Sequence, residues 1–378
     1  MKNLAIFYGG KSSEHDISII TAIQVMRSLN KNKYKIFPIY ITKNNSWIIP
    51  NDHLSIYNYA NNKVGGINIV GGFFDKFIVK KSRFGFKKMH RIDVAINCMH
   101  GLNGEDGTLA GILELADIPY VGSGVVASGV GMDKVIMKDI FRANGIPCAK
   151  YCCVGESFIC DDAQLSLAEK KLGYPIIVKP ANLGSSIGIN VSNTREELIK
   201  NIKIALNFDK KIILEQVITN LREINCSVLG CGDDVEVSVL EEPRGWKTFL
   251  DFNEKYMQKS TNPSKTVDVH ISEDIDNKIK SLSVKVFKLL GCSGIVRIDF
   301  LLDDKNKKVY VNEINTIPGS YANYLWGFKY DFGTLLDRLI EISEKEYICK
   351  NKYKYTYTSS VLERFGMGDK LNKNMITK

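Results

Sequence analysis

The first hundred residues alternate between short apolar runs and a stretch with helical periodicity, and this alternation restricts the fold more than any other feature. An apolar run at residues 3–8 ends at two glycines, as expected of a buried strand that enters a turn. Apolar residues then recur at helical spacing over 17–29, and strands are predicted at 34–42 and 94–98. This strand–helix–strand order predicts a parallel sheet that binds ligands at the carboxyl ends of its strands.

Two further units follow, in agreement with the two or three domains that about 150 residues per domain predict for a chain of 378 residues. We expect a first domain at residues 1–121, a central domain at 122–210 and a C-terminal domain at 211–378. A single helix is predicted at 132–144, and the polar stretch at about 251–274 is typical of a mobile loop. The predicted fold class is α/β, with a parallel-sheet domain followed by two α+β domains.

Composition narrows the class of protein. The nine cysteines include no Cys-x-x-Cys pair, which argues against a disulfide framework and a zinc site. No apolar run approaches the roughly 20 residues of a membrane-spanning helix, and the first residues do not form a signal peptide, so we expect a cytoplasmic protein without a membrane partner. The net charge of +9 is scattered, with local clusters at 80–88 and 350–354, and therefore favours anionic small molecules over nucleic acid as partners.

A turn rich in glycine and serine suggests a phosphate site. Lys179 ends the strand predicted at 175–180, and residues 181–188 lead into the next strand. Glycines let backbone N–H groups approach an anion, Ser185 and Ser186 add hydroxyl donors, and the lysine adds a positive charge. An ordinary hairpin with an exposed lysine fits this segment equally well.

Two strands near the end of the chain carry carboxylates in a pattern that favours a divalent cation. Asp299 lies in the strand at 294–302, while Glu313 and Asn315 end the next strand, two residues apart and so on one face. If the strands pair, these oxygen ligands converge and suit Mg²⁺ shared with substrate phosphates. Arg297 lies on the face of Asp299, where it can stabilise a developing negative charge. A solvated strand face is the alternative, and the apolar residues that alternate with the polar ones argue against it.

His100 belongs to a third polar segment, residues 99–108, directly after the strand at 94–98. The segment combines this histidine with two acidic residues and three glycines at a strand's carboxyl end, as is typical of a ligand-binding loop. A lone histidine is more often structural, so the segment by itself gives His100 no role.

Seven segments, in order along the chain, resemble the D-alanine–D-alanine ligases of the ATP-grasp superfamily. They are residues 9–18, 100–107, 120–124, 131–134, 178–188, 253–256 and 312–319. The resemblance implies a three-domain ATP-grasp fold, in which a Rossmann-like first domain precedes two α+β domains that enclose ATP. It also implies an ADP-forming ligase, acting as a homodimer, that joins two D-alanines through an acyl phosphate for peptidoglycan synthesis.

The resemblance also assigns roles to individual residues. Residues that match the family's ATP contacts are Lys134, Lys179, Ser185, Ser186, Glu215, Glu223 and Lys255. Residues that match the ligands of two Mg²⁺ ions, which Mn²⁺ can replace, are Asp299, Glu313 and Asn315. The catalytic matches are Glu14, Ser185 and Tyr256, which hold the loop closed, and Arg297 and the backbone N–H of Gly319, which stabilise the oxyanion. The substrate contacts are Glu14, His100, Lys255, Ser320 and Tyr324.

The segment after Gly319 departs from the family pattern. Tyr324 stands where the family has a serine that binds the second substrate's carboxylate, and residues 267–270 replace the usual Pro-Ala pair of the closing loop. Tyr324, Ser320 and Asn323 each have a group that can donate a hydrogen bond to such a carboxylate. Two other functions stay open: the same chemistry with D-serine or D-lactate as acceptor, and a non-catalytic nucleotide-binding relative. The retained lysines and metal ligands argue against the second.

Overall fold

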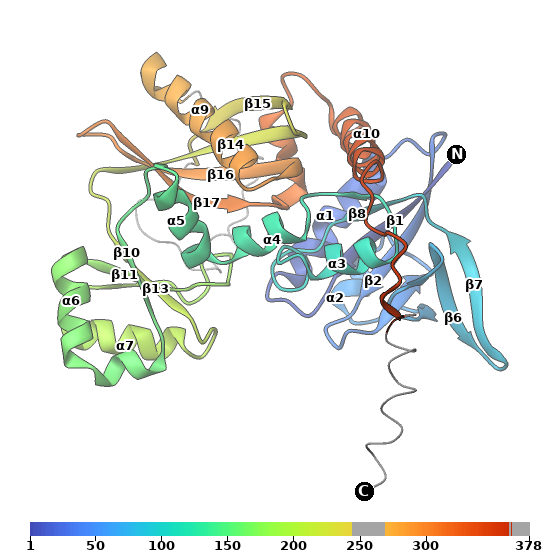
Figure 1. Cartoon of the computed structure of the whole chain (residues 1–378), viewed down its shortest axis with the longest axis horizontal. Helices are drawn as coiled ribbons and strands as arrows, with labels where there is room; N and C mark the ends of the chain where they lie inside the picture. The colour runs from blue at the N-terminus through green and yellow to red at the C-terminus, as the bar shows by residue number, and fades with distance from the viewer. Residues whose placement is uncertain (244–268, 363, 365–378) are drawn as a thin grey trace, which may run out of the picture.

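The computed structural model describes residues 1–243, 269–362 and 364, and its main sheets form three units (Figure 1). The first is a six-stranded sheet in the order β4-β3-β2-β1-β8-β9. Its strands are β1 (Lys2–Gly9), β2 (Tyr34–Ile41), β3 (Trp47–Pro50), β4 (Gly66–Ile69), β8 (Val94–Asn97) and β9 (Tyr120–Val121). The strands β2, β1, β8 and β9 pair in parallel, which confirms the predicted parallel sheet.

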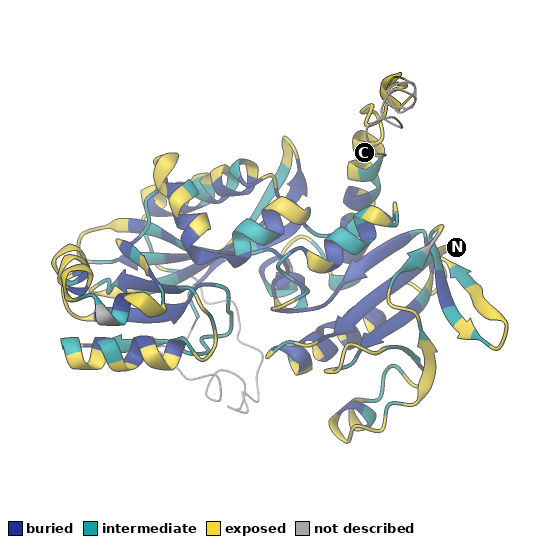
Figure 2. Cartoon of the chain, turned by 60° about the horizontal axis from the view of Figure 1, so that its bottom comes forward, coloured by how far each residue is buried: buried dark blue, intermediate teal, exposed yellow. Residues whose placement is uncertain are grey.

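Strand β1 lies inside the six-stranded sheet, between β2 and β8, and is buried on both faces. Its five residues from Leu4 to Tyr8 are fully buried, as expected of a parallel strand with helices or loops on each side. One face packs against α1 (His15–Ser28) and against α10 (Phe332–Lys350), which comes from the far end of the chain. The other face packs against α3 (Thr108–Leu115). Figure 2 shows these strands in the buried colour.

A small antiparallel sheet, β5-β6-β7, adjoins the first unit and extends away from it (Figure 1). Its strands are β5 (Phe73–Phe74), β6 (Phe77–Ser82) and β7 (Gly85–Arg91), and the short helix α2 (Ile56–Ala60) precedes them in the chain. Ile78 and Ile92 join the hydrophobic core of the six-stranded sheet, so the base of the β6–β7 hairpin is anchored while its far end is exposed.

The central unit is a four-stranded antiparallel sheet in the order β10-β13-β11-β12. Its elements are β10 (Tyr151–Val154), η1 (Glu156–Cys160), α6 (Asp162–Leu172), β11 (Ile176–Pro180), β12 (Asn190–Ser192), α7 (Arg195–Ala205) and β13 (Ile212–Gln216). Strand β13 pairs with both β10 and β11, so the predicted domain boundary after residue 210 lies one strand too early. The local pattern of β13 predicts a strand, but its partners are set by contacts distant in the chain.

The third unit is the antiparallel sheet β15-β14-β16-β17. Its elements are β14 (Leu221–Cys231), β15 (Asp234–Glu241), α9 (Glu273–Leu289), β16 (Ser293–Asp303) and β17 (Lys308–Asn315). Two helices that precede the central sheet in the chain, α4 (Val125–Met132) and α5 (Lys134–Ala143), contribute to this unit's core. The helix predicted at 132–144 is present as α5, whereas α4 directly before it was not predicted. The two helices are separated at Asp133, which has a ψ of 99° and whose carboxylate caps the start of α5.

Most of the predicted closing loop at about 251–274 lies outside the described residues, which resume at residue 269. The last two residues of the predicted loop, 273 and 274, belong to α9. After β17, the helical turns of η2 (Gly319–Leu325) lead to α10. Trp326 between them is fully buried, and its indole N–H donates to the Ser227 hydroxyl of β14 at 3.0 Å. The residues after β17 thereby tie the first unit to the third. No described helix has both the length and the apolar character needed to cross a membrane.

Candidate active site

Glu14 lies where the first and central units meet. It occupies the N-cap position of α1 and is 8% exposed, and its backbone N–H donates to the Ser12 hydroxyl at 3.1 Å. The hydroxyl of Ser185 donates to Glu14 Oε1. A Cβ on Gly101, whose φ is +67°, would lie 2.7 Å from Glu14 Oε2, so only glycine leaves room for this carboxylate. Glu14 and Ser185, two of the predicted catalytic group, are therefore in contact.

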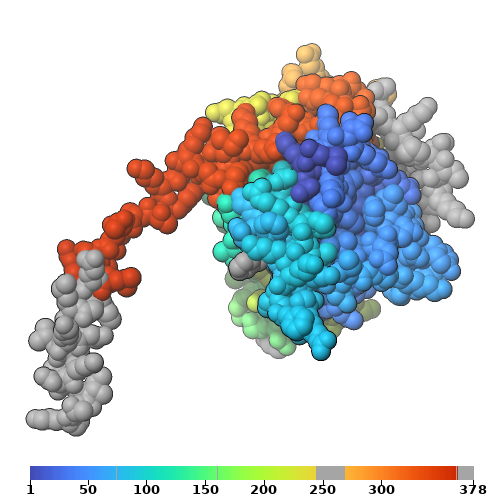
Figure 3. Space-filling view, turned by 90° about the vertical axis from the view of Figure 1, so that its right-hand side faces the viewer, coloured from blue at the N-terminus to red at the C-terminus, as the bar shows by residue number. Residues whose placement is uncertain are grey.

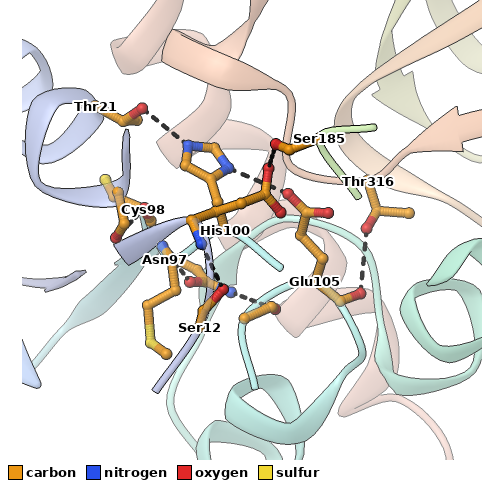
Figure 4. A network of polar contacts seen from close by, with 12 residues as sticks. Ser12, Thr21, Asn97, Cys98, His100, Glu105, Ser185 and Thr316 are labelled. Carbon is orange, nitrogen blue, oxygen red and sulfur yellow. Dashed lines mark hydrogen bonds and ion pairs between the residues drawn. The ribbon is translucent and has the colours of Figure 1, made fainter. Parts of the chain in front are cut away.

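His100 is buried at the carboxyl end of β8 and is held from two sides (Figure 4). Its Nε2 lies 2.9 Å from the Thr21 hydroxyl, and its Nδ1 lies 3.1 Å from Glu105 Oε1. A carboxylate on Nδ1 fixes the orientation of an imidazole ring. Glu105 is itself anchored, because its backbone N–H donates to the Gly101 carbonyl at 2.9 Å. The predicted ligand loop thus presents an oriented histidine next to Glu14.

The start of η2 approaches the same place from the other end of the chain. The backbone N–H of Ser320 donates to the Thr21 hydroxyl at 3.4 Å, and its side chain donates to Gln24 on α1. Ser320, Tyr321 and Ala322 have φ values of 49°, 54° and 48°, a left-handed conformation that costs about 1–2 kcal/mol per L-residue. The Tyr321 hydroxyl, which donates to the Asn97 carbonyl at 2.6 Å, helps to hold this backbone in place.

Lys179 and Glu215 form a buried cluster with a third residue that the sequence did not single out, Lys138. Glu215 Oε2 lies 2.9 Å from Lys179 Nζ, and its Oε1 lies 3.2 Å from Lys138 Nζ. Burial would raise the pKa of Glu215, but the two lysines outweigh it and lower that pKa. Burial also opposes the charge on Lys179, and here Glu215 and Glu313 outweigh it and raise its pKa. Glu215 and Lys179 are therefore both charged at neutral pH.

Lys138 is fully buried, and among the described residues its Nζ makes no well-oriented hydrogen bond. Burial lowers its pKa, with Glu215 opposing that shift. It lies one helical turn after Lys134 on α5, and i, i+4 residues share a helix face. The i, i+4 spacing from Lys134 was the one signal in the sequence that could have placed Lys138 at the site. A lysine in an amphipathic helix is normally exposed to solvent, so its burial was not expected.

Lys134 connects the glycine–serine turn with the carboxylates of the third unit. Its Nζ donates to the Leu183 carbonyl at 2.8 Å and lies 3.6 Å from Glu313 Oε2. In the same turn, Ser185 and Ser186 both have left-handed φ values, 53° and 58°. Successive backbone N–H groups in a tight turn can form a concave anion site. This part of the site therefore combines positive charge with a turn suited to phosphate.

The predicted metal ligands lie together because β16 and β17 pair in the required register. Asp299 is opposite Glu313, and Arg297 is opposite Asn315. The Asn315 amide donates to Asp299 Oδ2 at 3.2 Å, and Arg297 binds Asp299 through two hydrogen bonds of 2.6 and 2.8 Å. Burial opposes the charge on Arg297, but Asp299 outweighs it and holds the pKa of the guanidinium well above its usual value. The sequence did not indicate this bidentate pair.

The donor set fits a divalent cation that is shared with a phosphorylated substrate. Among the described residues, no group of three His, Cys, Asp or Glu side chains is placed to hold a metal ion alone. Asp299, Glu313 and Asn315 offer two carboxylates and an amide, all of them hard oxygen ligands. Mg²⁺ is usually bound by one or two carboxylates together with substrate phosphates and water.

Tyr324 is half-buried beside this arrangement. Burial raises the pKa of its phenol, the charge of Arg297 opposes the shift, and a hydrogen bond with Glu241 adds to it. The phenol is therefore a neutral hydrogen-bond donor at physiological pH, close to Arg297. The predicted acceptor contact and the predicted oxyanion donor are thus neighbours.

For the remaining predicted site residues, the structure gives fewer contacts. Glu223 lies on β14, and its charge helps to raise the pKa of Lys179. Gly319 begins η2, and no atom of the described residues lies within 4 Å of the position a Cβ would take. Lys255 and Tyr256 lie outside the described residues, so their roles stay predictions.

Comparison with known proteins identifies the relatives of this arrangement. A family model described as the D-ala D-ala ligase N-terminus matches residues 3–123, and one described as the D-ala D-ala ligase C-terminus matches residues 140–341. The D-alanine--D-alanine ligase of Thermosipho africanus is 39% identical over 367 residues, which cover 96% of this chain and 99% of that protein. The similarity thus spans nearly the full length of both.

The solved structures that are similar to this chain include ligases of the same kind. The D-alanine-D-alanine ligase from Coxiella burnetii has a TM-score of 0.79 at 29% identity, covering 93% of this chain and 96% of that one. The VanG D-Ala:D-Ser ligase from Enterococcus faecalis has a TM-score of 0.76 at 31% identity, covering 90% and 99%. The Bacillus anthracis D-alanine--D-alanine ligase complexed with ATP has a TM-score of 0.68 at 25% identity, covering 93% and 100%. These likenesses confirm the predicted ATP-grasp fold class.

Proposed function

Because the chain belongs to the D-alanine–D-alanine ligase family, a family of ligase enzymes, we propose that it joins two D-alanines into D-alanyl-D-alanine with ATP. The product would serve peptidoglycan precursor synthesis in the cytoplasm. One observation carries the proposal. Lys134 links the glycine–serine turn to Glu313, and Asp299 and Asn315 lie beside Glu313 on paired strands. A family member without catalytic function would have no need to keep this set together.

The first chemical step is activation of a carboxylate, which is a poor electrophile at neutral pH. Transfer of the terminal phosphoryl group of ATP makes it an acyl phosphate, and Lys134 and Lys179 would neutralise the triphosphate during this transfer. Asp299, Glu313 and Asn315 would hold two Mg²⁺ ions, or Mn²⁺ in their place, which supply further neutralisation of the phosphate oxygens. Glu215 and Glu223 would bind the adenosine, with Ser185 and Ser186 donating to phosphate.

The second step is attack by the amino group of the second D-alanine on the acyl phosphate, which forms the C–N bond. The tetrahedral intermediate then breaks its C–O bond to release inorganic phosphate, and the amine nitrogen loses a proton to solvent. Glu14 would bind the ammonium of the first D-alanine, next to His100. Arg297 and the backbone N–H of Gly319 would donate to the tetrahedral oxyanion, and one such donor contributes about 10²–10³ in rate. Ser320 and Tyr324 would bind the carboxylate of the second substrate. By resemblance, Lys255 and Tyr256 would help to exclude water, which otherwise hydrolyses the acyl phosphate.

ADP release tests the reaction directly. The full chain is incubated with Mg²⁺-ATP and D-alanine alone, and then with D-alanine paired with D-serine, D-lactate or L-alanine, with products identified by mass. We expect D-alanyl-D-alanine as the main product. The absence of any amino-acid-dependent ADP would contradict the proposal at its centre.

A different acceptor, such as D-serine or D-lactate, is the second candidate. Tyr324 favours it, since a phenol next to Arg297 presents a hydroxyl donor where the family has a smaller residue. The likeness to VanG, a D-Ala:D-Ser ligase, is compatible with it. A mixed dipeptide or depsipeptide as the main product would support this candidate over the first.

Substitution of Tyr324 separates the acceptor pocket from the nucleotide site. We expect Tyr324→Ser to change the apparent KM for the acceptor by about tenfold, the factor that one lost or altered hydrogen bond to a charged group produces, while the KM for ATP stays within twofold. Tyr324→Phe, which keeps the ring and removes only the hydroxyl, is the matched control for size. Equal changes in both KM values would mean that Tyr324 does not contact the acceptor.

We also propose that the chain forms a homodimer. The supporting observation is a pair of strongly exposed apolar side chains on neighbouring helices, Leu115 of α3 at 92% and Val126 of α4 at 76%. Exposed apolar groups of this kind are typical of protein interfaces. Sedimentation velocity should give a dimer for the unmodified chain and a monomer for Leu115→Asp/Val126→Asp. A monomer in both cases would contradict the proposal.

A further inference from the structure

The β6–β7 hairpin carries positive charge that the proposed reaction does not use. Four cationic residues lie near its far end: Lys80, Lys81, Arg83 and Lys87. The hairpin projects from the edge of the first unit in Figure 1, and in Figure 3 it lies uncovered on the face turned to the viewer. It belongs to a separate small sheet, distant from the residues of the candidate active site.

The charge at this end of the hairpin is not compensated by nearby carboxylates. At the base, Lys76 pairs with Asp117, Lys88 with Asp75 and Arg91 with Asp93. For the four cations near the tip, the part of the chain that the structure describes contributes no carboxylate within 4.0 Å, the limit for an ion pair here. The base of the hairpin is thus neutralised by the protein itself, and its far end is left positive.

The register of the two strands adds to this excess. Lys80 lies directly opposite Lys87 in the antiparallel ladder. Like charges at directly opposed positions destabilise a sheet. An anionic surface outside the protein would remove that repulsion, whereas nothing described within the protein does so.

Two aromatic side chains accompany the cations. Phe84, in the two-residue turn at the tip, is 94% exposed, and Phe86, which is opposite Lys81, is 73% exposed. The guanidinium of Arg83 lies 5.8 Å from the Phe84 ring centre. Aromatic rings flanked by lysine and arginine are typical of segments that lie at a membrane surface, where rings enter the headgroup boundary and cations meet lipid phosphates.

We propose that the β6–β7 hairpin docks the protein on an anionic lipid bilayer as a peripheral contact. Phe84 and Phe86 enter the interface, and Lys80, Lys81, Arg83 and Lys87 bind lipid phosphates. A narrow tip with two rings fits a bilayer surface better than a nucleic acid, which needs a basic groove lined with successive stacking platforms. The expectation of no membrane partner rested on spanning segments and a signal peptide, and a peripheral contact requires neither.

Binding to lipid vesicles tests the proposal with the full chain. Vesicles of phosphatidylcholine with phosphatidylglycerol are compared with pure phosphatidylcholine by co-sedimentation. Because each lysine near an anionic surface contributes about fivefold to binding, Lys80→Gln/Lys81→Gln/Lys87→Gln should reduce the partition coefficient about 100-fold at low salt. Phe84→Ser/Phe86→Ser should lose at least about tenfold, and this loss should persist at high salt, because burial of a ring is not screened.

A charge-matched control separates the hairpin from the net charge of the protein. Lys200→Gln/Lys203→Gln/Lys278→Gln removes three exposed positive charges from α7 and α9 and should keep binding within threefold. ADP release should be unchanged in all variants, which makes the result independent of the proposed ligase activity. Absence of vesicle binding, or an equal loss in the control, would overturn the proposal. Hairpin-dependent binding to single-stranded RNA that exceeds binding to vesicles would overturn it in favour of a nucleic-acid partner.

Discussion

Glu313→Gln is expected to lower kcat by about 10³-fold, because the substitution removes one of only two carboxylates from the proposed Mg²⁺ site. Glutamine keeps the length and the hydrogen-bonding capacity of the side chain, so the effect isolates its charge. Glu313 also faces Lys134 at 3.6 Å, so the same change alters the balance of charge at the phosphate site. The concentration of Mg²⁺ for half-maximal activity should rise together with the fall in kcat.

The control for this variant is Glu196→Gln on α7, an exposed residue in the first helical turn, for which kcat should stay within twofold. Circular dichroism and the urea midpoint would show whether Glu313→Gln remains folded. A folded variant with near-normal kcat and an unchanged Mg²⁺ dependence would remove Glu313 from the metal site.

Lys138→Met should destabilise the protein by about 3 kcal/mol, the lower end of the range for breaking a buried ion pair. Glu215 is 1% exposed and, among the residues that the structure describes, would keep Lys179 as its one paired lysine, so part of its charge would be left uncompensated. Methionine matches the shape of the lysine stem, which limits any cavity. Urea unfolding measures the loss, and isothermal titration with ATP measures whether the displaced Glu215 weakens nucleotide binding.

A double-mutant cycle tests whether this cost comes from the pair. If Lys138 acts through Glu215, Lys138→Met/Glu215→Gln should be more stable than the sum of the two single changes predicts, by at least about 1 kcal/mol. Strictly additive free energies would mean that the two residues do not interact, whatever their separation of 3.2 Å.

The sequence predicted those parts of the fold and the site that depend on local pattern. The continuous apolar run of β1 predicts a strand that is buried on both faces, as the structure shows. The two-residue period of β16 and β17 placed Asp299, Glu313 and Asn315 on one face before any pairing was known. The glycines beside His100 and Ser185 predicted ligand-binding turns, and in the structure Gly101 and Gly184 lie against Glu14.

The features that the sequence did not predict depend on contacts between distant segments. The partners of β13 are fixed by packing of the central sheet, so its composition does not say which domain it joins. Helix α4 was not predicted, because its glycines and valines have low helix propensity, and it packs into the core of the third unit. Lys138 of α5 is buried next to Glu215 of β13, a charged partner from a segment distant in the chain. The bidentate pairing of Arg297 with Asp299 likewise follows from side-chain geometry and not from spacing.

The position of α10 has a consequence for the order in which the chain can reach its native state during translation. Leu336, Leu339 and Ile340 complete the core formed by Leu4 and Ile6, so the first strand to leave the ribosome waits for one of the last helices to cover it. Domains usually fold in sequence as they are synthesised. The central unit can do so. In the N-terminal unit, α1 covers part of the apolar sheet face early, and the part that α10 covers stays exposed until residues 332–350 have emerged. Nascent chains that stop before residue 332 should therefore be the species that chaperones hold longest.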